Sequence, residues 1–394
     1  MNRMRRLVLL VSAVVLVDTM FYAAIVPLLP EYRDDLGLSK SAAGGLTASY
    51  AAGTLIGALP AGWLAGRVGG KRTVLAGLTL LAGSSVAFGF ANHIALLDIA
   101  RFVQGIGGAC SWAGGFAWLL AVAPRERRGE LIGTALGAAI FGVLLGPVLG
   151  GAATQTSPEL VFSSVGVLAI VLAAWALSTP ADTPERQASW REFAYALRGR
   201  PLMLAVWLMT LPALFSGTIG VLVPLRLAEL GAGGVTVGAV FLASAALEGA
   251  LSPILGRFSD RHGRLLPLRI GLAAAAAAAL LLPLPGTVWL LAAALLFAIA
   301  ALGMFWAPAA ALLSDSSESA GLDQGFAFGL MNLAWAAGQV VGGAAGGGLA
   351  DATADAVPFS LLALLCTATL VVASRSRRVG APPVGASARR PRSS

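Results

Sequence analysis

The sequence predicts an all-α membrane protein, in which twelve transmembrane helices form two pseudo-symmetric bundles of six. Hydrophobic residues make up 57% of the chain and charged residues only 12%, whereas soluble domains carry roughly a quarter charged residues. The apolar residues gather into runs of about 20 or more, the length that crosses a bilayer as a helix. A polar loop motif also occurs twice, about half the chain apart, and such a repeat is typical of two related halves.

The first span starts directly after Arg3, Arg5 and Arg6. It resembles a signal peptide, but its apolar run is too long and no small-residue cleavage site follows, so we expect an uncleaved span. The longest interior polar stretch separates the sixth span from the seventh and divides the chain almost evenly. The expected spans cover residues 7–30, 42–66, 73–91, 95–123, 131–154, 159–178, 201–225, 235–255, 265–284, 287–313, 325–350 and 356–373.

The domain organisation follows from these spans. In the interior polar stretch, Trp190, Phe193 and Leu197 recur at helical spacing among charged residues, which predicts a short amphipathic helix on the membrane surface. The C-terminal tail is rich in proline and arginine, a composition typical of disorder. We expect an N-terminal bundle at 1–178, a cytoplasmic central linker at 179–200, a C-terminal bundle at 201–373 and a disordered basic tail at 374–394.

The positive charges predict the orientation. In the expected topology, all but four of the 27 lysines and arginines lie on one side. The exceptions are Arg33, Lys40, Arg101 and Arg226. Cytoplasmic loops carry an excess of lysine and arginine, so both termini are expected in the cytoplasm and the protein in an inner or plasma membrane. The net charge of +8 therefore reflects topology, and we expect contact with the lipid bilayer but not with nucleic acid.

Several kinds of chemistry have no signal in the sequence. Cys110 and Cys366 both lie inside apolar runs, so no disulfide framework is predicted. The sequence shows no glycine-rich phosphate loop, no nucleophile motif and no cluster with metal-ligand spacing. We expect a monomer that is not an enzyme, needs no cofactor or metal, and does not use ATP.

The repeated polar loop begins at Gly62 and again at Gly256. Glycines permit tight turns, and the basic head groups hold the loop on one side of the membrane. We expect the two loops to brace the cytoplasmic side of the protein when that side is closed. The residues expected to do so are Gly62, Arg67, Gly69, Lys71, Gly256, Asp260, Arg261, Gly263 and Arg264.

The fifth span carries a glycine series that predicts close helix packing. Its residues are Gly142, Gly146, Pro147, Gly150 and Gly151. The proline is expected to bend the helix. The eleventh span repeats the series, which supports duplication, with Gly338, Gly342, Gly343, Gly346 and Gly347.

Asp18 lies near the middle of the first span, with Tyr22 one turn later on the same face. An ionisable group inside a membrane costs about 2.5–3.5 kcal/mol by insertion scales and usually marks an ion or substrate path. We expect its carboxylate to face the space between the bundles and to hold a proton and a cationic substrate in turn. The alternative is a carboxyl group hydrogen-bonded inside the bundle.

Arg101, Gln104, Gly108 and Ser111 form one polar face of the fourth span. Arg101 either pairs with Asp98, three residues earlier, or lines the cavity and acts on a carboxylate there. A structural or coupling role is favoured over direct substrate contact, because buried charges are usually paired.

Two further spans carry polar faces. In the eighth span, Ser244, Glu248 and Ser252 form a line that must point away from lipid; it serves either coupling or helix packing. In the eleventh, one face combines Asn332, Trp335 and Gln339. Its tryptophan, with two others, either lines a cavity or is an ordinary core or interface residue; the other two are Trp112 and Trp306.

These residues resemble the major facilitator superfamily, specifically its twelve-span drug:proton antiporter branch, over nearly the whole chain. The loop at 62–71 resembles the signature Gly-x3-Asp-Arg-x-Gly-Arg-Lys, with Gly66 at the Asp position, while the second copy has Asp260. The other matching stretches are Asp18-Thr19-Met20 with Pro27 and Pro30, Arg101 with Gln104 and Gly105, and residues 142–151. The first of these is also similar to vesicular amine transporters, although Asn332 stands where those proteins have Asp.

The resemblance implies the major facilitator fold, with a substrate site between the bundles near the bilayer midplane. It implies that Asp18 binds proton and substrate cation and that Arg101 takes part in proton coupling. The other expected binding residues are Tyr22, Gln104, Glu248, Asn332, Trp335 and Gln339.

We therefore expect a secondary active transporter that exports a small hydrophobic or cationic compound, a drug or metabolite, in exchange for protons by alternating access. Proton-coupled or facilitated uptake of a metabolite such as a sugar is the alternative. A non-transporting membrane sensor or scaffold is a more remote one.

Overall fold

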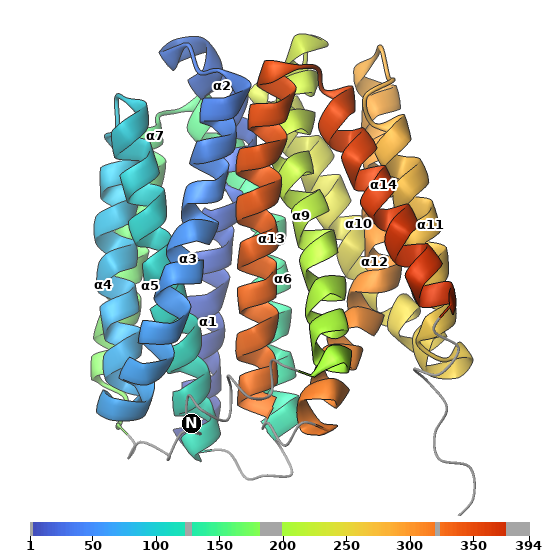
Figure 1. Ribbon diagram of the computed structural model, residues 1–394. Helices are drawn as coiled ribbons and strands as arrows, with labels where there is room; N and C mark the ends of the chain where they lie inside the picture. The colour runs from blue at the N-terminus through green and yellow to red at the C-terminus, as the bar shows by residue number, and fades with distance from the viewer. Residues whose placement is uncertain (1–2, 123–127, 182–198, 320–323, 376–394) are drawn as a thin grey trace, which may run out of the picture.

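The chain folds into long α-helices that pack side by side (Figure 1). The computed structural model describes residues 3–122, 128–181, 199–319 and 324–375. The first half contains α1 (Arg3–Ala23), α2 (Ile25–Leu36), α3 (Lys40–Val68), α4 (Gly70–Gly89), α5 (Ile94–Val122), α6 (Arg128–Gln155) and α7 (Pro158–Leu177). The second half contains α9 (Arg200–Glu229), α10 (Gly234–His262), α11 (Leu265–Leu281), α12 (Val288–Ser319), α13 (Gln324–Ala352) and α14 (Ala356–Arg375).

The length and composition of these helices fit a membrane protein. Within the described ranges, 10 candidate spans are long and apolar enough to cross a membrane, and α1 and α2 together form the first of them. α11 is a shorter apolar helix, and α13 is not among the 10. The prediction of an all-α membrane protein is therefore supported, although the described helices include 10 candidate spans and not the predicted twelve.

The first span differs from the single segment 7–30 that the sequence predicted. It is interrupted at Ala24 and continues as α2 as far as Leu36. The interruption comes just before Pro27, which has no N–H group to donate to the preceding turn. α2 ends at Gly37, whose φ of 63° is a left-handed conformation that glycine adopts easily.

The repeated loop motif folds into the same tight turn in both halves. Gly69 separates α3 from α4 with a φ of 91°, and Gly263 ends α10 with a φ of 78°. Residues with a Cβ atom are strained at such angles, so these two glycines are needed for the turn itself.

The helices fall into two groups. Most helices of α1 to α7 pack chiefly on one another, as do most of α9 to α14, whereas α2 and α10 pack on both groups. The groups meet where α3 lies along α13 and where α6 lies along α10. α4 and α7 lie at one outer edge of the molecule, and α11 and α14 lie at the other (Figure 1).

The glycine series of α6 brings that helix very close to α1. A Cβ atom built at Gly142 would lie 2.0 Å from Thr19 Oγ1, and one at Gly150 would lie 2.1 Å from the Ala24 carbonyl oxygen. Any side chain there would push the helices apart. The close packing predicted from the spacing is therefore confirmed, except at Gly151, where a Cβ atom would meet nothing within 4 Å.

The glycine series of α13 brings that helix very close to α9. A Cβ atom at Gly342 would lie 2.0 Å from the Leu214 carbonyl oxygen, and one at Gly338 would lie 2.5 Å from that of Thr210. Threonines add a matching hydrogen bond between helices in each half. Thr19 Oγ1 donates to the Ala139 carbonyl at 3.0 Å, and Thr218 Oγ1 donates to the Gly342 carbonyl at 3.1 Å.

Some expectations fall on residues outside the described part of the chain. These are the surface helix with Trp190, Phe193 and Leu197, most of the central linker, the tail from 376 onward and the side chain of Asp260. Cys110 and Cys366 are free and buried, as predicted.

Candidate functional site

Asp18 of α1 is fully buried. Its Oδ2 accepts a hydrogen bond from the Tyr50 hydroxyl of α3 at 3.0 Å and another from Trp112 Nε1 of α5 at 3.1 Å. Its Oδ1 has no hydrogen-bond partner among the described residues. A buried polar atom without a partner is costly, so this oxygen has an unused capacity to bind a proton or a cation.

Gly108 of α5 makes room for this arrangement. A Cβ atom built at Gly108 would lie 2.7 Å from the Tyr50 hydroxyl oxygen and 3.0 Å from each carboxylate oxygen of Asp18. Even a methyl group would therefore displace the carboxylate or its donor. Gly108 determines where the Asp18 carboxylate can lie.

The sequence predicted that the Asp18 carboxylate faces the space between the two halves, and this is wrong for the state seen in the structure. The carboxylate is enclosed within the first helix group, behind Tyr50, which is only 4% exposed. A carboxyl group in an apolar bundle is stabilised by donors around it, and Tyr50 and Trp112 supply two. Any exchange at Asp18 requires these side chains to move.

Arg101 of α5 is also fully buried. Its Nη1 donates to Gln104 Oε1 at 2.7 Å and to the Phe21 carbonyl at 3.2 Å, and its Nη2 donates to the Tyr22 carbonyl at 2.9 Å. The alternative that Arg101 pairs with Asp98 is wrong, because Asp98 instead accepts from Ser49 at 3.1 Å. Arg101 turns inward to α1, just before the interruption at Ala24, and ties α5 to that helix.

Aromatic rings surround the Arg101 guanidinium group. Its central carbon lies 5.2 Å from the ring centre of Tyr50 and 5.8 Å from those of Phe21 and Tyr22. Cation–π attraction at such distances stabilises a charge that has lost most of its hydration. The Arg101 side chain therefore lies in a cage of carbonyl oxygens and ring faces close to Asp18.

An aromatic bridge connects this region to the second helix group. We use this name for Tyr22, Tyr50 and Trp335. The ring centres of Tyr22 and Tyr50 are 4.7 Å apart, and Trp335 of α13 lies 5.5 Å from Tyr22 and 6.5 Å from Tyr50. Because Tyr50 also holds Asp18, the bridge connects the carboxylate to the opposite half through one side chain.

The structure brings together six of the residues predicted from the sequence, namely Asp18, Tyr22, Arg101, Gln104, Trp112 and Trp335. Other predicted residues lie outside this cluster. Gln339 is buried where α13 packs on Gly217 of α9, Asn332 is partly buried, and Glu248 is exposed. The sequence reasoning missed Tyr50, whose only signal was a hydroxyl-bearing ring within a span of small and apolar residues.

Ion pairs join the two helix groups at the end of the molecule where α2 lies, which we call the α2 end (Figure 1). Glu229 of α9 is 3.0 Å from Arg33 of α2 and 3.6 Å from Lys40 of α3. Lys40 is also 2.6 Å from Asp355, just before α14. A Cβ atom at Gly44 would lie 2.4 Å from the carbonyl oxygen of Gly343. The α2 end is therefore closed by charge pairing and by backbone contact between α3 and α13.

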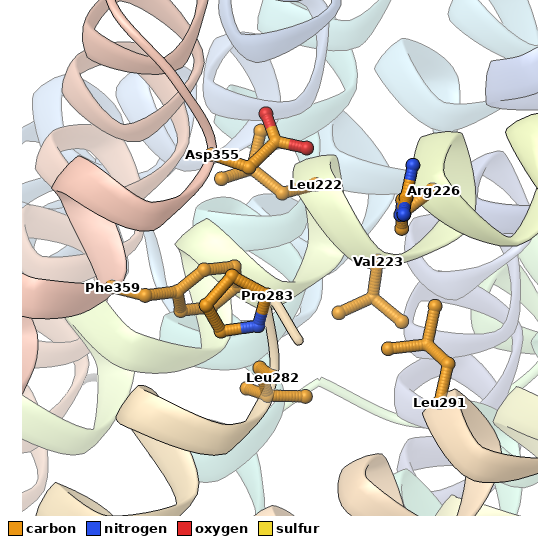
Figure 2. A pocket seen from close by; sticks show the side chains of 8 residues that line it. All are labelled: Leu222, Val223, Arg226, Leu282, Pro283, Leu291, Asp355 and Phe359. Carbon is orange, nitrogen blue, oxygen red and sulfur yellow. The ribbon is translucent and has the colours of Figure 1, made fainter. Parts of the chain in front are cut away.

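A small cleft adjoins these ion pairs (Figure 2). Its lining residues are Leu222, Val223, Arg226, Leu282, Pro283, Leu291, Asp355 and Phe359. Its free volume of about 10 Å³ is close to that of one water molecule. Its two charged residues are already engaged, Arg226 with Glu229 at 3.2 Å and Asp355 with Lys40. The cleft is therefore too small and too fully paired to be a substrate site.

The repeated loops lie at the opposite end, and each contacts its own helix group. Lys71 Nζ donates to the carbonyls of Leu177 and Thr179, at 2.8 and 2.7 Å, at the end of α7. Arg264 pairs with Asp315 of α12. These contacts differ from the predicted bracing of the closed cytoplasmic side, because each loop binds within its own half in this state.

The remaining loop residues make less contact. The Arg67 guanidinium lies 5.0 Å from the ring centre of Trp63, and Arg261 is exposed. Cβ atoms built at Gly62 and Gly256 would meet nothing within 4 Å.

Comparison with known proteins identifies the family. The description "Major Facilitator Superfamily" matches residues 11–225 and 207–393. The chain belongs to the Major Facilitator Superfamily. This confirms the resemblance drawn from the loop, span-one, span-four and span-five residues.

Superfamily members of known name are similar to the chain over different lengths. It is 26% identical to multidrug resistance protein 1 of Bacillus subtilis over 340 residues, which cover 83% of this chain and 85% of that protein. It is 34% identical to the human synaptic vesicular amine transporter over 131 residues, or 32% of this chain and 26% of the transporter. It is 30% identical to the MFS-type transporter ppzB of Metarhizium majus over 139 residues, only 30% of that protein.

Solved structures of superfamily members share the fold. A bacterial homologue of the human lysosomal transporter Spinster, in an inward-facing and unoccupied conformation, superposes with a TM-score of 0.77 at 14% identity, covering 95% of this chain and 96% of that one. The xylose transporter XylE of E. coli, in a partially occluded inward-open conformation, superposes with a TM-score of 0.71 at 16% identity, covering 95% and 99%.

Proposed function

We propose that this protein is a secondary active transporter that exports a small hydrophobic or cationic compound in exchange for protons. The observation that carries the proposal is the enclosed Asp18 carboxylate, with one unpartnered oxygen, linked by Tyr50 to the aromatic bridge between the halves. An intramembrane carboxylate of this kind usually marks an ion or proton path. Multidrug resistance protein 1 of Bacillus subtilis, which is similar over most of the chain, supports a drug-like substrate.

The transporter works by alternating access, with twelve spans in two six-helix bundles that rock about the central site. The closed α2 end and the absence of described loop contacts across the opposite end support a state that opens at the end carrying the N-terminus. Both similar solved structures are described as inward conformations. Together with the distribution of basic residues, this supports a topology with the N-terminal end in the cytoplasm and the α2 end outside the cell.

In this scheme Asp18 binds a proton and a cationic substrate in turn. When Tyr50 and Trp112 hold its Oδ2, the carboxyl group is closed to the substrate and carries a proton. Movement of Trp335 away from Tyr22 and Tyr50, as the halves separate, opens the aromatic bridge and admits a cationic substrate. Proton and cation compete for the same oxygen atoms, so release of one accompanies binding of the other. Arg101 stays hydrogen-bonded to α1, so its positive charge remains close to Asp18 throughout.

The test uses the full-length protein reconstituted into lipid vesicles with an acidic lumen. An antiporter accumulates the fluorescent cation ethidium on the acidic side, and the accumulation stops when the pH gradient is collapsed. We expect Asp18→Asn to reduce the gradient-driven rate at least about tenfold, equivalent to about 1.4 kcal/mol. An asparagine keeps an acceptor for Tyr50 and Trp112, so the variant should fold.

Asp98→Asn is the matched control, because Asp98 is also a carboxylate of the first helix group and, among the described residues, is hydrogen-bonded only to Ser49. The rate of ethidium accumulation by Asp98→Asn should stay within about twofold of that of the original protein. The contact between Asp98 and Ser49 is only partly buried, and exposed polar contacts contribute well under about 1 kcal/mol. Full gradient-driven transport by Asp18→Asn would refute the exchange mechanism. Xylose-stimulated proton entry, instead of ethidium exchange, would indicate the sugar uptake that the sequence left open.

A further inference from the structure

Helix α10 is exposed on two opposite faces in its middle section. Ala246, Ala250 and Ile254 are exposed and form an outer stripe. Glu248 and Ser252 are also exposed and form an inner stripe. At about 100° per residue, the centres of the two stripes lie roughly 180° apart on the helix. A helix at the surface of a bundle has one lipid-facing side, so the second exposed side borders a space within the protein.

The neighbours of α10 show which stripe faces inward. A Cβ atom at Gly238 would lie 3.0 Å from the Pro147 carbonyl oxygen of α6, so that face of α10 is turned to the first helix group. Leu255 points to Gly303 of α12, where a Cβ atom would lie 3.1 Å from Leu255 Cδ1. Glu248 falls on the arc between these two faces, whereas the apolar outer stripe falls on the opposite arc. The inner stripe therefore looks between α6 and α12.

The inner face is exposed only in the middle of its described length. Toward the α2 end, Val237 and Ser244 are 0% and 3% exposed. One turn later Glu248 is exposed, followed by Ser252. Farther along the same face, nearer the repeated loops, Ser259 is again only 6% exposed. Glu248 and Ser252 thus form a short exposed section of the inner stripe, between buried Ser244 and buried Ser259.

The Glu248 carboxylate has neither an ion pair nor a hydrogen bond with any residue in the described ranges. A carboxylate inside a membrane bundle is costly and normally has a partner. Lipid contact would leave that cost unmet, and the inner stripe faces away from lipid. A bound ligand with a positive group would provide the missing partner.

We propose that Glu248 forms a second, separate binding site for the charged group of an organic cation entering from the loop end. The inference rests on the export function proposed above and names its substrate class as hydrophobic cations. Asp18 is closed in this state, behind Tyr50 and Trp112, so it does not receive the substrate first. Glu248 takes the cation from the open side, and rocking of the halves then delivers it toward the aromatic bridge.

Accessibility tests the geometry. Three single variants, Glu248→Cys, Ala246→Cys and Ser244→Cys, are treated with a water-soluble, membrane-impermeant maleimide in vesicles whose loop end faces outward. The two native cysteines are buried and give the background. We expect only Glu248→Cys to react above that background. An unreactive Glu248→Cys, or equal reaction of Ala246→Cys on the outer stripe, would overturn the inference.

Ligand binding tests the chemistry. The purified full chain is titrated in detergent with tetraphenylphosphonium, a permanent cation, and with triphenylphosphine oxide, a neutral compound of similar shape. Glu248→Gln should weaken binding of the cation roughly tenfold, as expected for loss of one charged contact, and leave the neutral compound unchanged. Glu248→Asp should restore most of the affinity for the cation, because it restores the charge.

The outcomes separate this inference from the proposed function. If Glu248→Gln binds tetraphenylphosphonium as tightly as the original protein, or loses both compounds equally, the second site is refuted, whatever Asp18→Asn does. No binding of the cation by the original protein refutes it too, while pH-driven exchange would still stand. If Asp18→Asn retains full exchange but Glu248→Gln loses cation affinity, the proton mechanism fails and the cation site remains.

Discussion

The two helix groups share a scaffold but differ in what they hold at its centre. Thr19 and Thr218 make the same hydrogen bond across matching glycine contacts. The residues directly before them are Asp18 and Gly217. In the described chain, the first group therefore encloses a carboxylate where the second has no side chain.

The helices that flank this position differ in the same way. Tyr50 and Ser244 lie equally far before the turn glycines Gly69 and Gly263. Tyr50 donates to Asp18, whereas Ser244 donates only to the Val240 carbonyl of its own helix at 2.9 Å. The two halves share the contacts between backbones, which depend on small residues, but not the polar centre. We infer that the scaffold and the chemistry were selected separately.

The largest expected effect concerns the polar centre itself. Arg101→Ala removes three hydrogen bonds, leaves Gln104 and two carbonyls without their donor, and creates a void. We expect a loss of about 3 kcal/mol in the free energy of unfolding, measured by unfolding in mixed detergent micelles. Arg269→Ala is the control in the other half, since Arg269 is only partly buried and donates to one carbonyl, that of Ala373. A loss as large for Arg269→Ala would contradict the contrast between the halves.

A smaller effect is expected where a glycine positions the carboxylate. Gly108→Ala places a methyl group against Asp18 and Tyr50, and overpacking of this kind costs about 1–3 kcal/mol. Because Asp18 must shift, the pH profile of ethidium exchange should change as well. Gly303→Ala in the second half meets only the flexible end of Leu255 and should leave the profile unaltered. An unchanged profile for Gly108→Ala would show that the carboxylate position does not matter.

The smallest effects should be equal in the two halves. Thr19→Val and Thr218→Val keep the side-chain shape and each removes one hydrogen bond between helices. Interhelix hydrogen bonds in membrane proteins contribute about 0.6 kcal/mol on average, so each variant should lose about that much stability in the same unfolding assay. Losses that differ by more than about 1 kcal/mol would show that the two contacts are not equivalent.

The parts of the fold that depend on local spacing could be predicted from the sequence. The glycine series identified which faces of α6 and α13 pack closely, because a missing Cβ acts on the nearest helix regardless of the rest. The turn glycines Gly69 and Gly263 were visible as a repeat for the same reason. Span ends were less predictable, since α2 carries its helix through polar residues as far as Leu36.

The parts of the site that depend on which helices meet could not be predicted. Tyr50 reaches Asp18 only because α3 and α1 both pack on α5 with particular rotations. Arg101 had a sequence neighbour in Asp98, yet the interruption of α1 at Ala24 lies close by and Arg101 binds carbonyls there instead. The loop contacts depend on the conformational state of the whole molecule, which no local pattern specifies.

The ion pairs at the α2 end have a consequence for how the surroundings influence the carrier. Glu229, Arg33 and Lys40 are each between 18% and 31% exposed at their side chains, so dissolved salt reaches them. Mobile ions screen charges over about 8 Å at physiological ionic strength and over about 3 Å in molar salt. High salt would weaken these ion pairs, whereas the glycine contact between α3 and α13 carries no charge and would persist. The salt concentration of the medium would thus affect how readily the α2 end opens.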